Sequence, residues 1–110
     1  MRTLTFTVTG QYLNTHPDCD FKGLIPGSEG YLKAEFIFSP EWKDLTKAAA
    51  FFSIMGKEYT PKLLEDGKSC IIPAEALTKR KFKIRVIGQG KDGHKLITNK
   101  LTISQNGGKE

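Results

Sequence analysis

The sequence has few of the residues on which enzymes, metal sites and disulfide-rich domains depend. Its 110 residues include two cysteines, two histidines and one tryptophan. Two distant cysteines are too few for the disulfide framework of a small secreted domain, so we expect Cys19 and Cys70 to be free thiols in a reducing cytoplasm. No stretch approaches the roughly 18 apolar residues of a membrane-spanning helix, which predicts a protein without membrane contact.

His16 and Cys19 form the closest pair of metal-ligand residue types. With two residues between them they could supply two zinc ligands, and folding could add Cys70 or His94. Structural zinc sites usually draw on a second closely spaced pair, and this sequence has none. We therefore expect no metal site, and we interpret these residues as a polar loop with one buried thiol.

Motifs for catalysis and for nucleotide binding are equally scarce. Neither histidine lies in a recognisable nucleophilic motif. The closely spaced acids, Asp18 with Asp20 and Glu65 with Asp66, lie in predicted turns, where acids are common for local hydrogen-bonding reasons. Residues 88–90 precede a predicted hairpin instead of a helix, so their glycines cannot cradle a phosphate. The sequence predicts no catalytic residues, no cofactor and no enzymatic activity.

Length and composition indicate one domain. A chain of 110 residues has room for one hydrophobic core, and its 38% hydrophobic and 26% charged residues are typical of a globular protein. Residues 1–10 alternate polar and apolar side chains, which a secretory signal does not. We expect residues 1–104 to form the domain and the polar residues 105–110 to form a flexible C-terminal tail.

Apolar residues recur at every second position, which is typical of β-strands with one buried face. Three segments show this alternation: residues 3–9, 31–38 and 81–88. Residues 47–54 are rich in Ala and Phe and lack alternation, as in a central strand covered on both faces. Residues 14–29 hold prolines, glycines and scattered charges, which indicates a long irregular connection or a short edge strand around residues 21–25.

Turn and cap residues separate these segments. Residues 56–57, Asp66 with Gly67, and residues 90–93 are predicted to close hairpins. Pro40 and Pro73 stand where a helix could begin, each with room for a single turn. The resulting pattern of about seven short strands favours an all-β fold, an immunoglobulin-like antiparallel β-sandwich.

The order and spacing of several segments also suggest a family. Residues 31–47 read YLKAEFIFSPEWKDLTK, and they are followed by IPAEAL at residues 72–77, VIG at 86–88 and ITNKLTI at 97–103. Together these segments resemble the immunoglobulin-like N-terminal domain of upper baseplate proteins from phages of Gram-positive bacteria. The resemblance covers roughly residues 3–104. It implies a structural module without a catalytic motif, packed against neighbouring subunits at the host-recognition end of the virion.

Positive charge is the main functional signal in the residues themselves. The formal net charge is +5, and strand geometry places Lys81, Lys83 and Arg85 on one face with about 6.6 Å between neighbours. Such a row can meet an acidic partner surface or phosphates, and it can equally be a soluble outer face that guards a strand edge against aggregation. Phe82 alternates to the opposite side, so no ring is expected beside the cations for base stacking, which makes nucleic acid the less favoured partner.

Tyr31 and Trp42 are the aromatic candidates for partner contact. At an exposed sandwich edge an aromatic side chain can grip a protein or a sugar ring, whereas a Trp near a strand end can instead cover the core. The predicted partner-binding residues are therefore Lys81, Lys83, Arg85, Tyr31 and Trp42.

Three functions follow as expectations. The resemblance implies a phage or prophage structural module that contacts other phage structural proteins in the virion, at the baseplate, tail or capsid surface, and is assembled in the cytoplasm of the bacterial host. The second function is a small phage-encoded inhibitor that binds a host defence protein or nuclease in that cytoplasm. The third is a basic nucleic-acid-binding module. A homo-oligomer is compatible with each.

Overall fold

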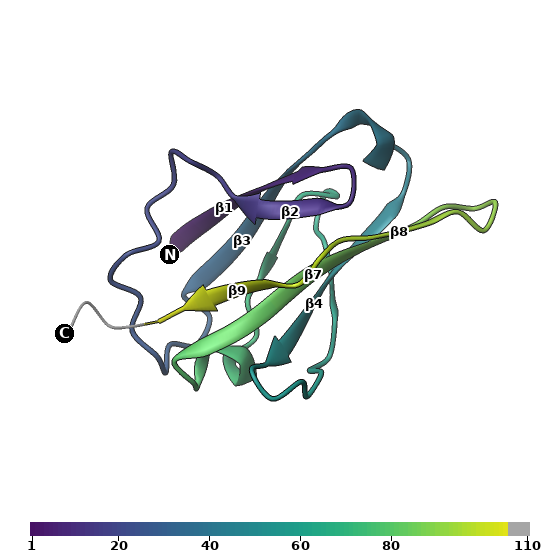
Figure 1. Ribbon diagram of the computed structural model, residues 1–110. Coiled ribbons are helices and arrows are strands. Elements are labelled where there is room, and N and C mark those ends of the chain that lie inside the picture. Colours follow the sequence, from purple (N-terminus) through teal and green to yellow (C-terminus); the bar gives the residue numbers. More distant parts are fainter. Residues whose placement is uncertain (106–110) are drawn as a thin grey trace.

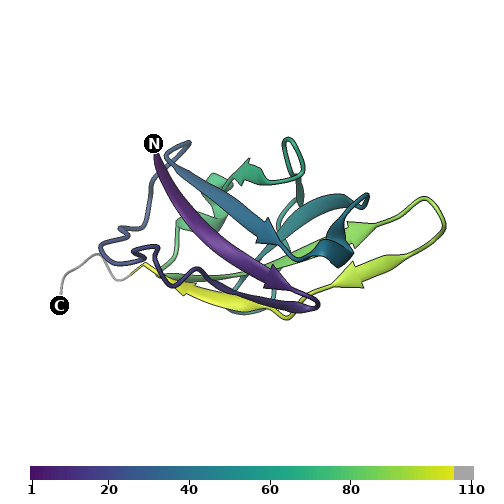
Figure 2. The ribbon, with the colours of Figure 1, turned by 90° about the horizontal axis from the view of Figure 1, so that it is seen from above.

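The computed structural model describes residues 1–105 and shows a two-sheet, all-β protein (Figure 1). We call the two sheets sheet A and sheet B. Sheet A has the strand order β2 (Tyr12–Thr15), β1 (Arg2–Thr9), β3 (Leu32–Phe38), β6 (Ser69–Ile71). Sheet B has the order β5 (Lys62–Leu63), β4 (Thr46–Ser53), β7 (Lys81–Gln89), β8 (Lys95–Ile97), with β9 (Leu101–Ser104) also paired to β7. Seen from above, the two sheets form two layers, and the hairpin between β7 and β8 projects beyond them (Figure 2).

The predicted fold class is confirmed at the level of two β-sheets, but the expectation that all strands are antiparallel is wrong. β1 pairs with β3 in parallel, in a register that runs from Arg2 opposite Leu32 to Val8 opposite Phe38. A parallel pair needs a long crossover connection, and residues 16–31 provide it together with β2. This connection contains no strand, so the alternative of a short edge strand at residues 21–25 is also wrong.

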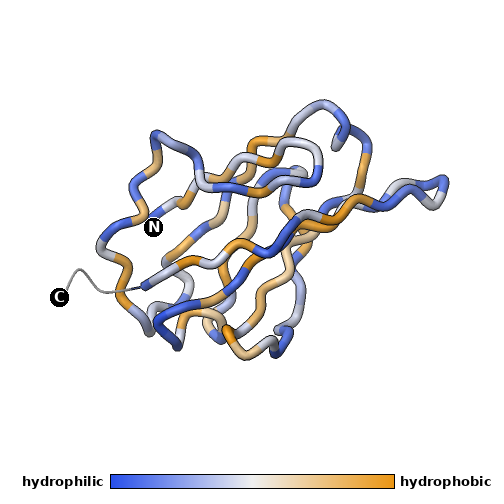
Figure 3. Tube along the Cα trace, viewed as in Figure 1, coloured by the Kyte–Doolittle hydropathy of each residue, from blue (hydrophilic) through white to orange (hydrophobic). Residues whose placement is uncertain are grey.

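The alternating segments form the core strands, as predicted. Leu4, Phe6 and Val8 of β1 are at most 1% exposed, while the threonines between them lie on the outer face. Strands β3 and β7 show the same alternation of buried and exposed residues. Figure 3 shows the corresponding alternation of hydrophobic and hydrophilic residues along the trace. Period-two patterning therefore predicted the buried faces of β1, β3 and β7.

β4 is covered on both faces, as its lack of alternation predicted. Ala49, Ala50, Phe51 and Phe52 are all buried, and Ala49 and Phe51 belong to the core between the sheets. Phe52 lies opposite Lys83 of β7, on the outer face of sheet B, where it is nevertheless only 3% exposed.

The two predicted helical turns are present as short 3-10 helices, η1 (Pro40–Trp42) and η2 (Ala74–Leu77). The turn predicted at Asp66 and Gly67 is also present, and both residues have the positive φ angles, 53° and 68°, that favour this residue pair in a tight turn. It is closed by the single bridge between Glu65 and Ser69 and does not join a hairpin, because the flanking strands β5 and β6 lie in different sheets. The residue types at these positions were therefore sufficient to predict the two helical turns and the tight turn.

Trp42 is seated in the core between the two sheets. Its indole Nε1 donates a hydrogen bond of 2.7 Å to the carbonyl oxygen of Gly10, and its ring packs 5.2 Å from the ring of Phe38. The ring also lies against Gly88 of β7, where a Cβ atom would approach Trp42 Cζ3 to 2.7 Å. Trp42 is 0% exposed, which corrects the expectation that it contacts a partner and supports its role as a cover of the core.

β8 and β9 form one strand interrupted by a β-bulge. Ile97 lies opposite Ile87 and Leu101 opposite Ile84, so the β8–β9 side has one more residue than β7 between these pairs. Within the bulge, the Thr98 hydroxyl accepts the hydrogen bond of the Val86 N–H. The bulge therefore shifts the side chains that follow it by one position relative to β7.

Asn99, in this bulge, joins the edge of sheet A to sheet B. Its side-chain Oδ1 accepts a hydrogen bond of 2.7 Å from the Leu13 N–H, and its Nδ2 donates one of 3.3 Å to the Leu13 carbonyl oxygen. The amide thereby pairs with the backbone of β2 as a neighbouring strand would, and it covers part of an otherwise open sheet edge.

Gln105 belongs to the folded domain. It is 0% exposed, and its Nε2 donates hydrogen bonds to the carbonyl oxygens of Leu77 and Lys79. This corrects the predicted start of the flexible tail, because a buried amide with two acceptors is fixed in place. The other residues of the predicted tail, 106–110, lie outside the described residues.

Replacement of Gly88 by alanine should lower the free energy of unfolding by about 1–3 kcal/mol, because the new methyl group collides with the rigid ring of Trp42. Gly90→Ala is the matched control, since its Cβ would meet Asp92 Oδ1 at 3.1 Å, Leu45 Cδ2 at 3.2 Å and His94 Cβ at 3.3 Å, all farther away than the Trp42 ring is from a Cβ at Gly88. Urea denaturation followed by Trp42 fluorescence measures both variants. An equal effect of the two substitutions would contradict the packing described here.

Candidate functional site

The outer face of sheet B carries a row of cations, and we call this surface the basic face. Lys81, Lys83 and Arg85 alternate along β7 with the buried core residues, as predicted, so they share one face at intervals of about 6.6 Å. Lys100, in the segment between β8 and β9, joins them because its ammonium lies 4.1 Å from the ring centroid of Phe52 on the same face. The basic face is therefore broader than the sequence indicated.

The Phe52 ring makes cation–π contacts with two of these cations. The Arg85 guanidinium carbon lies 5.2 Å from the centroid of the ring and the Lys100 ammonium lies 4.1 Å from it. Cation–π contacts of this kind contribute about 0.5–2 kcal/mol and hold the long side chains in place. Sequence reasoning missed this aromatic residue, although the unbroken apolar run of β4 already implied that alternate residues face outward.

An apolar row lies across the basic face, at the far end of β7 from Lys81. The strand registers place Ala48 opposite Leu63 on one side and opposite Ile87 on the other, with Ile97 next to Ile87. Leu63 is 70% exposed, and Ile87 and Ile97 are partly exposed. The face is therefore amphipathic, with the apolar row lying between Lys95, which is opposite Gln89, and the cations from Arg85 to Lys81.

One carboxylate shares this face, because Glu58 is the bridge partner of Phe52, but it forms no ion pair with the cations. None of the five strands of sheet B contains Asp or Glu. Within residues 1–105 no Lys or Arg lies within 4.0 Å of a carboxylate, and the one close pair of opposite type joins His94 to Asp92 at 3.8 Å. The outer face of sheet A differs, since its β1 positions are threonines and β3 contributes both Lys33 and Glu35. Positive charge is thus concentrated on one side of the molecule.

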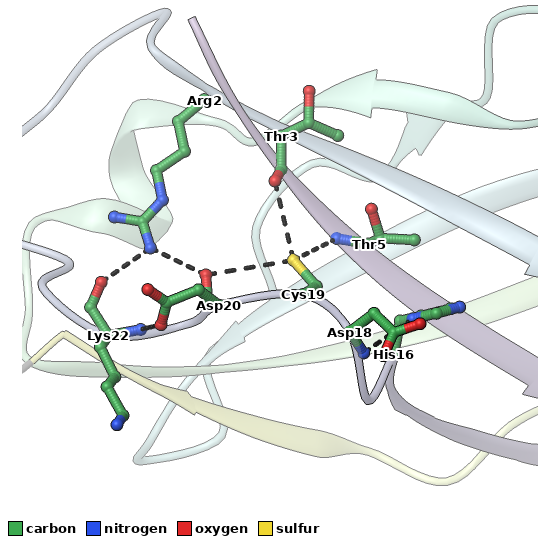
Figure 4. A pocket seen from close by; sticks show the side chains of 8 residues that line it. All are labelled: Arg2, Thr3, Thr5, His16, Asp18, Cys19, Asp20 and Lys22. Carbon is green, nitrogen blue, oxygen red and sulfur yellow. Dashed lines mark hydrogen bonds between the residues drawn. The ribbon is translucent and has the colours of Figure 1, made fainter.

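A shallow pocket lies at the edge of β1, where β2 has ended (Figure 4). Here the Cys19 sulfur accepts a hydrogen bond of 3.3 Å from the Thr5 N–H and lies 3.8 Å from the Thr3 carbonyl oxygen. The Arg2 guanidinium donates to the carbonyl oxygens of Asp20 and Lys22. These contacts attach residues 19–22 to the open strand edge, so the polar loop has a structural explanation.

The metal-ligand types singled out in the sequence do not assemble into a site in the part of the chain that the structure describes. No group of three His, Cys, Asp or Glu side chains converges in residues 1–105. His16 uses its Nδ1 atom to accept the Asp18 N–H at 3.1 Å, and His94 lies in the hairpin between β7 and β8.

Tyr31 lies apart from the cations. It precedes β3 of sheet A, is 49% exposed and lines a small pocket with Leu24 and Ile25. The basic face belongs to the other sheet, so the structure does not unite Tyr31 with Lys81, Lys83 and Arg85 in one surface.

Comparison with protein-family models, curated proteins and solved structures returns no significant match. The functional interpretation of the chain therefore depends on its own residues and geometry. Among residues 1–105, no helix has the length and apolar character needed to span a membrane.

The two cysteines are both free thiols, in agreement with the prediction from the sequence. Cys19 lies beside the edge of β1, and Cys70 lies on β6. The strands β1 and β3 stand between the two residues in sheet A. Three inter-strand spacings amount to about 14 Å, which is beyond the reach of a disulfide. Burial raises the pKa of the Cys70 thiol from 9.0 to about 12, although nearby Lys62 opposes this shift.

Cys70 should therefore resist thiol reagents while the protein is folded. In a Cys19→Ser variant, we expect labelling of Cys70 at pH 8 to be at least about 1000-fold slower than in the unfolded chain, because a pKa rise of three units reduces the thiolate fraction by that factor. The thiol contributes stability that is complete below pH 9 and is lost between pH 9 and 12, where the thiol of the unfolded chain ionises first. Mass spectrometry measures the labelling, and rapid modification of folded Cys70 would contradict its burial.

Proposed function

We propose that this protein is an immunoglobulin-like, non-enzymatic module that acts by protein–protein contact in a phage virion, with the basic face as its adhesive surface. The observation that carries the proposal is the concentration of cations on one exposed sheet face. The strands of that sheet contain no Asp or Glu, and the one acid paired beside them, Glu58 opposite Phe52, forms no ion pair with the cations. Opposite charge across an interface steers association and fixes the orientation of the partner.

The fold supports a binding role in place of catalysis. The candidate catalytic groups are explained by local structure, since Cys19 caps an open strand edge and His16 closes a turn. A broad, regular sheet face suits contact with another protein, as in other β-sandwich domains. Placement in the virion rests on the resemblance of residues 31–47 and the segments that follow them to baseplate domains.

Basic side chains are also compatible with the inhibitor and nucleic-acid functions. Nucleic acid is disfavoured by Phe52, because its ring is 3% exposed and is covered by Arg85 and Lys100. Proteins that bind single-stranded nucleic acids usually present exposed aromatic rings on which the bases stack.

Fractionation of phage particles from cells that produce the protein tests the proposal. We expect the protein to sediment with intact particles in a fixed copy number, and we expect the variant Lys81→Glu/Lys83→Glu to be depleted from them at least ten-fold. Lys33→Glu is the matched control, because it adds the same kind of charge change on the outer face of sheet A. Absence of the unmodified protein from particles, with capture of a single host protein instead, would overturn the virion role in favour of an inhibitor.

A further inference from the structure

The basic face has a polarity along β7 that constrains its partner. Ile87 lies in the apolar row, Arg85 follows, and Lys83 and Lys81 lie toward the other end of the strand. The distance from Ile87 to Lys81 is about 20 Å along an extended strand. An occupant must therefore offer anionic groups at distances of about 7 to 20 Å from its apolar groups.

We propose that the basic face binds a short, acidic, amphipathic segment of a partner protein. Its apolar side chains contact Leu63, Ile87 and Ile97, and its carboxylates contact Arg85, Lys83 and Lys81. This inference deepens the proposed function by naming the chemistry of the partner, and it rests on that function only for the place of the interaction in the virion.

The Arg85 side chain is held in a position that suits contact with a carboxylate of such a partner. Its guanidinium is held over Phe52, and its Nε atom is buried without a hydrogen-bond acceptor among residues 1–105. No carboxylate within that range lies close enough to form an ion pair with it. A guanidinium pairs with a carboxylate through two parallel hydrogen bonds, so an acidic side chain is the group that suits the Nη atoms of Arg85, whereas the buried Nε lies out of reach of a partner.

The apolar row favours a protein over a nucleic acid. Leu63 exposes 70% of its surface next to Ala48 and Ile87, and a phosphate backbone offers nothing to desolvate these groups. Protein interfaces combine an apolar centre with charged groups around it.

A second copy of this chain does not fit the same face. A two-fold symmetric contact would place the cations of one copy against the cations or the apolar row of the other, and neither supplies the carboxylates that the cations need. The net charge of +5 adds to the repulsion. The occupant is thus a chemically different, acidic chain.

Binding of defined polymers to the purified protein tests this inference. The probes are a fluorescent copolymer of glutamate and leucine, poly-L-glutamate and oligothymidine, and fluorescence anisotropy is measured at low and high salt. We expect the copolymer to bind at least ten-fold more tightly than poly-L-glutamate, because only the copolymer can use the apolar row. Tighter binding of oligothymidine than of the copolymer would overturn the inference in favour of nucleic acid.

Substitutions test separately how the cations and the apolar row of the basic face contribute to binding. Lys83→Glu/Arg85→Glu should weaken binding of both acidic polymers at least ten-fold, and Leu63→Ser should reduce the preference for the copolymer without changing binding of poly-L-glutamate. Lys33→Glu on sheet A should change affinity less than two-fold, and a loss equal to that of the double variant would refute the location.

Lys81→Glu/Lys83→Glu provides a second variant that leaves the Arg85–Phe52 contact intact if the first unfolds. Trp42 fluorescence during urea denaturation reports whether each variant is folded. The measurement uses purified protein, so its result is independent of whether the protein sediments with phage particles. Failure of the polymer test with normal sedimentation would reject the inferred partner chemistry and leave the virion role standing.

Discussion

The contact between Trp42 and the backbone of Gly88 connects the two sheets. The indole packs on β7 through one face, approaches Phe38 of β3, and donates its N–H to the turn at Gly10. Three segments that are distant in the sequence are therefore positioned by one side chain, and the glycine is needed because any Cβ would occupy the space of the ring. The position of β7 against sheet A in turn directs its alternate residues, including Lys83 and Arg85, toward solvent.

Local patterns predicted the strands, the short helical turns and the basic row, because each depends on residues that are neighbours in the sequence. The parallel pairing of β1 with β3 could not be predicted in this way, since the hydrophobic alternation of a strand is the same for either direction of its partner. Trp42 shows a related limit. A tryptophan at this position could have formed a surface contact or filled the core. It is buried because Gly88, which has no side chain, leaves room for the indole ring against β7.

Only part of the candidate site could be predicted from the sequence, for a similar reason. The spacing of Lys81, Lys83 and Arg85 placed them on one face, but their neighbours across the sheet come from other strands. Phe52 on β4 and Lys100 in the β8–β9 bulge reach the same surface only through the strand register. The bulge matters here because one extra residue changes which side chains face outward. A surface with both cations and an apolar row is consequently a property of the assembled sheet.

The amide of Asn99 has a consequence for how the protein is made. Its partner, Leu13, lies 86 residues earlier in the chain. During translation the N-terminal hairpin leaves the ribosome long before Asn99 is synthesised, so the edge of β2 lacks its cover for most of that time. Unprotected strand edges are where nascent chains associate wrongly. The edge of β2 is thus completed late, by one of the last segments of the chain to be made.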